Sequence, residues 1–260
     1  MIRGLYTAVS GLVTQEAKQQ VITNNMANAN TTGYKSDNLA VKKFDDVLIQ
    51  NYDKMSAGRN VRNIIGSLSN GSRIDETLTD FTQGMLQATD KDTDFALEGR
   101  GFFTVRVTAA DGSEGVFYTR DGEFRVNNQG YLVNSSGNYV LGRNVATGAL
   151  EPMEVGNSKI STDMNNNILL DGQVYYNFNI VDFENYQAME KVGDNLYSGE
   201  NPIESQAVVK QNSLEKSNVN IINEMVNMMT VMRTFESNQK VVQSIDETLS
   251  KAVNEIGTVR

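Results

Sequence analysis

The chain has 260 residues, a formal net charge of −9, and neither cysteine nor histidine. That length suffices for one large domain or two modest ones with a real hydrophobic core. The acidic balance leaves no basic stripe to neutralise phosphates, which argues against nucleic acid as a partner. The missing cysteine and histidine exclude disulfides, thiolate and imidazole metal sites, and Ser-His-Asp or Cys-His catalysis.

The chain lacks the features of a membrane span or a cleaved signal. No run approaches the roughly 18 to 20 apolar residues that a span needs, so we expect no membrane insertion. The N-terminal stretch GLYTAVSGLV is broken by Thr, Ser and Gly, and only Arg3 precedes it. We therefore expect no cleavable signal peptide, and any export would use another route.

Residues 2–28 are predicted to form an amphipathic helix, which by spacing alone could be an ordinary core helix. Its apolar face begins with Leu5, Val9 and Leu12. The helix should stop at ANANTTGYK, where Asn28 favours a turn and Gly33 can adopt a positive φ.

Residues 37–70 are expected to be a linker segment of mixed pattern. The stretch NLAVKKFDDVLIQNYDKM can form a short helix with Leu39, Phe44, Val47 and Leu48 inward, and SAGRN and GSLSNGS have the composition of loops.

Residues 71–211 are predicted to form a β-rich domain, because short β-like runs alternate there with turn residues. The candidate strands are GFFTVRV, VFYTR, EFRV, GYLVN, YVLG, NILL and VYYNFNIVDF. NNQ followed by Gly130 is a good hairpin connection between EFRV and GYLVN. The pattern favours an antiparallel sandwich or barrel.

Residues 212–260 are predicted to contain a long C-terminal helix, because Val219 to Ile256 includes neither Gly nor Pro. Its apolar stripe is Met225, Met229, Met232, Phe235, Val242, Ile245, Leu249, Val253 and Ile256. Such a helix would be about 55 Å long, and Gly257 suits its end. A small globular domain has no room to cover it, so the stripe requires a partner.

The expected fold is therefore mixed α and β. The N- and C-terminal helices, residues 1–36 and 212–260, would pair into one helical domain as a coiled-coil layer. The mainly antiparallel β-domain would be an insertion between them.

Each candidate motif for catalysis or cofactor binding lacks a residue that the motif requires. Asp90, Asp92 and Asp94 have the spacing of a calcium loop, but Phe95 and Gly101 occupy the positions that require Gly and Glu. GRGFF lacks the third glycine of a dinucleotide fingerprint. Paired acids such as Asp45 and Asp46 are usually a solvated surface. We expect no enzyme activity, no metal and no cofactor.

The four methionines Met225, Met228, Met229 and Met232 have two interpretations. They could simply fill a helix seam. Their adaptable side chains also suit a surface that packs against several non-identical neighbours, which is the interpretation we favour.

Four stretches together resemble the bacterial flagellar basal-body rod protein family, the axial proteins of the flagellar rod and hook. They are ANANTTGYK, TDFTQGMLQATDKDTDFALEGRGFFTV, YTRDGEF with GYLVNSSGNYVLG, and LEKSNVNIINEMVNMM. They cover both ends and the middle of the chain. The N-terminal stretches are similar to both proximal and distal rod proteins, and RTFESNQKVVQSIDETLSKA is slightly closer to the proximal one. Residues 51–72 depart from the linker segment that separates rod from hook proteins.

This resemblance implies a structural subunit that stacks head-to-tail into a helical tube, with paired terminal helices around an export channel and the β-domain outside. It implies as partners copies of the same chain, neighbouring rod and hook proteins, and the flagellar type III export apparatus. The location would be the basal body, outside the cytoplasmic membrane, reached without a cleaved signal. We expect the uncovered ends to be frayed or disordered before assembly.

The expected assembly interface has three parts. The turn after the first helix contributes Asn28, Thr31, Gly33, Tyr34 and Lys35, and the segment before the second helix contributes Ser217, Asn218 and Val219. The helix faces contribute Leu5, Val9, Leu12, Met225, Met229, Met232, Phe235, Val242, Ile245 and Leu249.

Two other functions remain open from the residues alone. One is a self-contained monomeric binding module whose turns form the ligand site, with both helices packed on the β-domain. The other is a secreted adhesin whose turns bind glycan or matrix.

Overall fold

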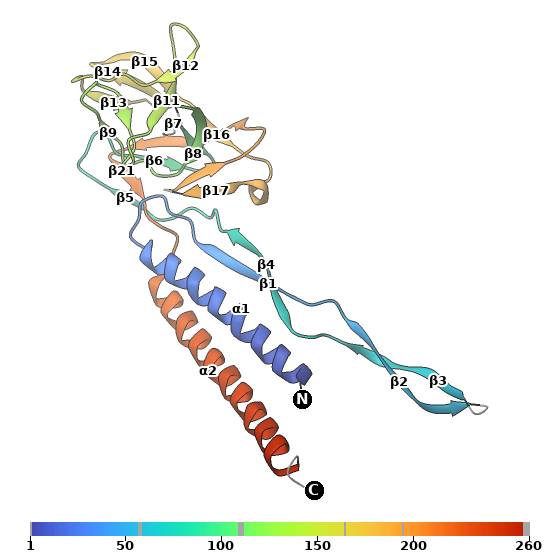
Figure 1. The fold of residues 1–260 in the computed structure, drawn as a ribbon. Coiled ribbons are helices and arrows are strands. Elements are labelled where there is room, and N and C mark those ends of the chain that lie inside the picture. Colours follow the sequence, from blue (N-terminus) through green and yellow to red (C-terminus); the bar gives the residue numbers. More distant parts are fainter. Residues whose placement is uncertain (1, 57–58, 109–111, 164, 194, 257–260) are drawn as a thin grey trace. The chain divides into compact units, whose positions relative to one another are not determined.

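The computed structural model describes residues 2–56, 59–108, 112–163, 165–193 and 195–256. The chain divides into two compact units, each built from separate segments (Figure 1). We call Met1–Met26, Asp37–Leu78 and Ile221–Arg260 the helix–ribbon unit, and Ala27–Ser36 with Thr79–Asn220 the β unit. The fold is mixed α and β, as predicted.

The two predicted helices are present in the helix–ribbon unit. They are α1, Ile2–Ala27, and α2, Ile221–Lys251, which continues as a π-helical turn over Ala252–Ile256. They lie side by side and antiparallel, since Gly4 is next to Ile245 and Gly11 is next to Asn238 (Figure 1). Gly257, the expected helix end, lies outside the described residues, as does the side chain of Ile256. Neither described helix combines the length and apolarity that crossing a bilayer requires.

The side chains of α2 and of its π-helical continuation that are at least partly buried follow one another at intervals of four and three residues. They are Glu224, Met228, Val231, Phe235, Asn238, Val242, Ile245, Leu249 and Ala252. Their neighbours on α1 include the two glycines Gly4 and Gly11. Small residues on one helix thus face larger ones on the other, which lets the helices approach closely.

The prediction of a short helix after residue 37 is wrong, because this segment forms two-stranded antiparallel ribbons. The strands are β1 (Asp37–Lys43), β2 (Val47–Ser56), β3 (Arg59–Leu68) and β4 (Ser72–Thr79). β2 pairs with β3, and β1 pairs with β4. Phe44, Val47 and Leu48, expected to point inward, are 40%, 52% and 55% exposed. Strand pairing satisfies the backbone of this segment without burying those side chains.

Contacts with α1 hold both ends of this ribbon segment. The Asn25 side chain accepts a hydrogen bond from the Asp37 N–H (3.0 Å) and donates one to the Asp37 carbonyl (2.9 Å). At the other end, the Ser72 N–H donates to Ser10 Oγ at 3.3 Å. Gly71 fits there because an added Cβ would lie only 2.0 Å from Ser10 Oγ. Local polar contacts therefore position the ribbons on the helix.

The β unit is built around one 13-stranded sheet, flanked by two strand pairs. Its strands are β7 (Phe102–Thr108), β8 (Glu114–Thr119), β9 (Arg125–Val126), β10 (Leu132–Val133), β11 (Tyr139–Asn144), β12 (Leu150–Pro152), β13 (Ile160–Thr162), β14 (Asn167–Leu170), β15 (Gln173–Phe178), β16 (Ile180–Asp182), β17 (Glu190–Gly193), β18 (Leu196–Ser198) and β19 (Ile203–Glu204). The pairs are β5 (Leu86–Ala88) with β21 (Ser213–Glu215), and β6 (Phe95–Glu98) with β20 (Val208–Gln211). A short 3-10 helix covers Tyr186–Ala188.

The strand candidates of the β-rich segment are confirmed. Each of the predicted runs overlaps a strand between β7 and β16, and the pairings within this sheet are antiparallel. The expected hairpin after EFRV pairs β9 with β10, and Gly130 has a φ of +89°. Asp94, the third acidic residue of the rejected calcium-loop pattern, is buried and forms a backbone bridge with Glu123.

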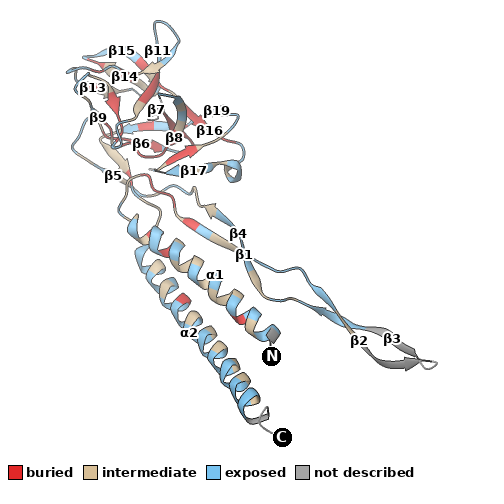
Figure 2. Cartoon of the chain, viewed as in Figure 1, coloured by how far each residue is buried: buried red, intermediate tan, exposed pale blue. Residues whose placement is uncertain are grey.

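The main hydrophobic core lies within the β unit. Phe95, Phe103, Leu132, Met153 and Ile168 are each at most 1% exposed and belong to one cluster of side chains. Figure 2 shows buried residues gathered in this unit, while exposed residues cover much of the helices and ribbons. The β unit therefore supplies most of the buried apolar surface among the described residues.

Candidate functional site: a buried junction of the terminal segments

The segment after α1 forms a tight turn inside the β unit. The Thr31 N–H donates to the Asn28 carbonyl (3.1 Å), and the Thr31 hydroxyl lies 3.2 Å from Asn28 Oδ1. Gly33 has a φ of +66°, and an added Cβ would lie 2.4 Å from the Asp121 nitrogen. Glycine is required here by both the backbone conformation and the close approach. Tyr34, the next residue, is 2% exposed.

The segment before α2 meets this turn directly. The Gly33 N–H donates to the Glu215 carbonyl at 2.8 Å, and the Ser36 N–H donates to Asn218 Oδ1 at 2.8 Å. The Asn218 amide also donates to the Asp80 carbonyl at 2.8 Å. One asparagine side chain therefore connects three stretches of chain. We call residues 28–36 and 213–219, with the side chains that hold them, the terminal junction.

A buried ionic cluster occupies the centre of the terminal junction. Lys35 Nζ lies 2.6 Å from Glu215 Oε1, and Arg120 Nη1 lies 3.2 Å from Glu215 Oε2. Glu215 also accepts a hydrogen bond from the Gly84 N–H (2.8 Å), and Lys35 donates to the Thr82 carbonyl (2.7 Å). The three charged side chains are at most 3% exposed. Removing one partner would leave another charge buried without compensation.

Burial shifts the titration of the charged groups in the terminal junction. It lowers the pKa of the Lys35 ammonium, while the nearby Glu215 carboxylate opposes that shift. It also raises the pKa of the Asp121 carboxyl, although this group accepts a hydrogen bond from the Thr32 hydroxyl at 2.7 Å. Lys191 covers one side, with Nζ 4.1 Å from the centre of the Tyr34 ring.

The eight junction residues predicted from the sequence are brought together in the β unit. Asn28, Thr31, Gly33, Tyr34 and Lys35 form the turn, and Ser217, Asn218 and Val219 form the facing segment. These groups form hydrogen bonds with chain segments far apart in sequence, so the arrangement is suited to holding the segment after α1 and the segment before α2 together.

The predicted helix residues are distributed over more than one side of the helices. Phe235, Val242, Ile245 and Leu249 belong to the partly buried line of α2. Met225, Met229 and Met232 lie outside that line and are 50%, 51% and 45% exposed. On α1, Leu5 and Leu12 are half-buried and Val9 is 41% exposed. The residues next to α2 include Gly4 and Gly11, which an apolar periodicity does not reveal.

Sequence reasoning missed the charged centre of the terminal junction. Glu215 and Arg120 lie in the stretches LEKSNVN and YTRDGEF, but nothing in their spacing pairs them with Lys35. The available signal was a glutamate directly after the apolar Leu214 in a stretch of β character. That signal is weak because an acidic residue at such a position is usually solvated.

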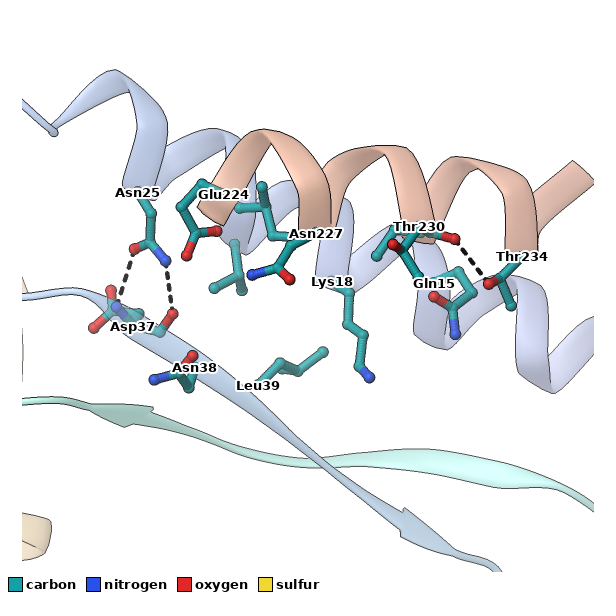
Figure 3. A pocket seen from close by; sticks show the side chains of 13 residues that line it. Gln15, Lys18, Asn25, Asp37, Asn38, Leu39, Glu224, Asn227, Thr230 and Thr234 are labelled. Carbon is teal, nitrogen blue, oxygen red and sulfur yellow. Dashed lines mark hydrogen bonds between the residues drawn. The ribbon is translucent and has the colours of Figure 1, made fainter. Parts of the chain in front are cut away.

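A groove in the helix–ribbon unit provides a second feature, between α1, α2 and β1 (Figure 3). Its volume is about 400 Å³, and its lining mixes apolar side chains with amides, threonines, Lys18 and Glu224. Figure 3 shows the Lys18 side chain directed from α1 toward β1. Burial raises the pKa of the Glu224 carboxyl. Within the described part of the chain, no three acidic side chains converge in a way that could hold a metal ion.

Three segments of the chain match family descriptions. Residues 5–35 match "Flagella basal body rod protein", residues 96–176 match "Flagellar hook protein FlgE/F/G D1 domain", and residues 210–255 match "Flagellar basal body rod FlgEFG protein C-terminal". The first match includes residues 28–35 of the terminal junction, and the third includes residues 213–219.

Curated relatives match over nearly the whole length. The flagellar hook-basal body complex protein FlhO of Bacillus subtilis is 30% identical, with 100% of each chain covered. The flagellar basal-body rod protein FlgG of the same species is 32% identical, over 98% of this chain and 99% of the relative. FlgF of Caulobacter vibrioides is 31% identical over 100% of both chains. The chain therefore belongs to the flagellar basal-body rod protein family.

Proposed function

We propose that this protein is a structural subunit of the flagellar basal-body rod. In this proposal, copies of the chain stack head-to-tail with neighbouring rod and hook proteins into a helical tube that carries torque. Contacts of this heterologous kind do not close on themselves, so such a tube can grow. The terminal helices would form a coiled-coil layer around an export channel, and the β unit would form the outer domain.

The observation that carries this proposal is the uncovered apolar surface of α2. Ile222, Met225, Val226 and Met229 are spaced i, i+3, i+4 and i+7, so they share one side of the helix. They are 73%, 50%, 51% and 51% exposed. The residues of α2 that lie next to α1 are others, such as Asn238 and Ile245. The first half of α2 therefore has a second apolar side, and a helix that is apolar on more than one side requires a further partner.

Methionine suits such a surface. Its flexible thioether adapts to neighbours of different shape, which a subunit in contact with several rod proteins would require. Each large side chain covered on assembly would contribute roughly 1.5–3 kcal/mol before the cost of ordering is subtracted. We also propose export through the flagellar type III apparatus without a cleaved signal, and a location outside the cytoplasmic membrane.

The test is to place a charge on this surface. Met229→Asp or Met232→Asp should abolish assembly into tubes and leave the β unit folded, because an aspartate cannot be buried there without a partner. Ser237→Asp is the matched control, since it adds the same charge at an exposed position of α2 that is already polar. Electron microscopy detects the tubes, and circular dichroism follows the fold. Straight tubes from the methionine variants would overturn the assignment of this surface.

A further inference from the structure

A pocket on the β unit combines tyrosine rings with carboxylates. Its volume is about 360 Å³, within the usual range for ligand pockets. It is lined by Arg106, Glu114, Tyr131, Tyr139, Glu151, Pro152, Glu154 and Tyr176. We call this the tyrosine–glutamate pocket. Six of these residues lie in strands between β7 and β15, and Tyr131 and Glu154 pair in a backbone bridge outside the strands. Backbone pairing therefore holds the lining in place.

Two rings form walls at a right angle. The centroids of Tyr131 and Tyr139 are 5.6 Å apart, and their planes meet at 90°. Tyr176, the third tyrosine, is 8% exposed. The backbone bridge between Tyr131 and Glu154 places an aromatic residue directly opposite an acidic one. Aromatic faces carry partial negative charge, so walls of this kind attract a cation.

The charged residues of the pocket reinforce that preference. The lining has three carboxylates and one guanidinium, a formal excess of two negative charges. Arg106 pairs with Glu114, the closest approach being 3.4 Å. Glu151 accepts a hydrogen bond from the neutral Asn144 amide, and the ion pairs among the described residues give neither Glu151 nor Glu154 a basic partner. Two carboxylates thus remain for a positively charged ligand.

We propose that the tyrosine–glutamate pocket binds an organic cation, the lysine or arginine side chain of another protein. The rings would enclose the apolar stem and the cationic head, and Glu151 and Glu154 would pair with the charge. A surface tyrosine–carboxylate pair without a cavity would bind such a group only weakly. Binding in this pocket does not depend on assembly into a rod, so it can be measured on the unassembled chain.

The experiment is a titration of the full chain carrying ¹³C-labelled tyrosine, followed by NMR. The first probe is n-butylammonium chloride, with sodium chloride and n-butanol as separate controls at matched concentrations. We expect saturable shifts at Tyr131, Tyr139 and Tyr176 with the ammonium and not with either control. Shifts that are linear, or that sodium reproduces, would overturn the proposal.

Two variants test whether the cation binds in this pocket, and a second probe tests whether the cation can be a protein side chain. Glu154→Gln, at an exposed position, should weaken butylammonium binding roughly two- to fivefold, whereas Glu200→Gln, also exposed but outside the pocket, should not. A capped pentapeptide with one lysine should bind at least as well as butylammonium, and its norleucine analogue should not bind. If butylammonium bound and the lysine peptide did not, the proposal that the occupant is a protein side chain would be wrong. If butylammonium bound equally well to the Glu154→Gln and Glu200→Gln variants, the assignment of the binding site to this pocket would be wrong.

Discussion

The two units of this molecule differ in where their apolar side chains go. In the β unit, Phe95, Phe102, Phe103 and Tyr197 are at most 1% exposed. In the helix–ribbon unit, few of the described side chains are buried. Large apolar side chains such as Ile65 (63%) and Ile222 (73%) are exposed there. The β unit has a large hydrophobic core within one chain, although some of its side chains, such as Met85 (77%), are exposed. The helix–ribbon unit has no core of that size among the described residues.

This contrast has a physical consequence for folding. A two-stranded ribbon is marginally stable in water, and helices in proteins depend on packing more than on intrinsic propensity. We therefore expect the helix–ribbon unit to have a low local stability, which the neighbouring subunits of the proposed rod would raise. The terminal junction belongs to the β unit, so the residues that connect directly to both helices are held whether or not those neighbours are present.

The largest effect should come from the ionic cluster. Glu215→Ala leaves Lys35 and Arg120 buried without their carboxylate, so we expect the β unit to lose roughly 3–5 kcal/mol of unfolding free energy. Glu98→Ala is the matched control, because Glu98 pairs with Lys210 at 2.8 Å but is 55% exposed. That control should cost at most about 1 kcal/mol. Urea unfolding followed by tyrosine near-ultraviolet circular dichroism measures both, and equal losses would contradict a structural role for the cluster.

The next effect separates backbone conformation from close packing at Gly33. Gly33→Ala meets both a positive φ and the Asp121 backbone, and should cost more than the roughly 1–3 kcal/mol of backbone strain. Gly137→Ala has a similar positive φ of +88° but nothing within 4 Å of the new Cβ. The difference in urea midpoint between the two variants isolates the packing contribution. If Gly137→Ala were equally destabilising, the close approach at Gly33 would have no energetic weight.

A smaller effect should come from the contact between the two helices, and it should be opposite in sign at two positions of α1. Gly4→Ala should stabilise the helices by about 0.5–1 kcal/mol, because its Cβ would reach Ile245 at an ordinary 3.7 Å. Gly11→Leu should destabilise them by roughly 1–3 kcal/mol, because even a Cβ would lie 3.0 Å from the Asn238 amide. Far-ultraviolet circular dichroism during thermal unfolding reports the helices. Shifts of the same sign would mean that this contact does not form in solution.

The smallest effect concerns pH. Because burial raises the folded-state pKa of Asp121, the folded protein holds this proton more tightly than the unfolded chain. The free energy of unfolding should therefore fall as the pH rises from the unfolded pKa to the folded one. Asp121→Asn keeps an acceptor for the Thr32 hydroxyl but does not titrate. Its stability relative to the native chain should increase across that interval, and a constant difference would show that Asp121 is not desolvated.

Much of this fold follows from local pattern. The helix periodicity, the strand runs and the turn at Gly33 each depend on residues close in sequence, so they could be predicted. The ribbons could not, because Leu39, Phe44, Val47 and Leu48 fit one face of a helix as well as a strand. Their pairing with partners such as Leu68 depends on a long hairpin whose register no short motif specifies.

In the candidate site, too, the local features could be predicted from the sequence and the long-range contacts could not. Asn218 and Lys35 lie in recognisable stretches, but their partners are separated from them by most of the chain, as in the Lys35–Glu215 pair. A buried charge is an exception to ordinary burial preference, so composition does not reveal it. Gly4 and Gly11 were also missed, because a helix contact made by the absence of a side chain leaves no apolar signal.

The most direct test of the contrast between the units is hydrogen exchange on the dilute full chain, region by region. We predict fast exchange over α1 and α2 beside slow exchange in the β unit, including β7, β11, β15 and the terminal junction. That result would mean that the helices are not stably folded until neighbouring subunits bind, whereas the terminal junction is already formed in the single chain. Slow exchange over both helices, comparable to that of the β core, would contradict it and favour a self-contained binding module.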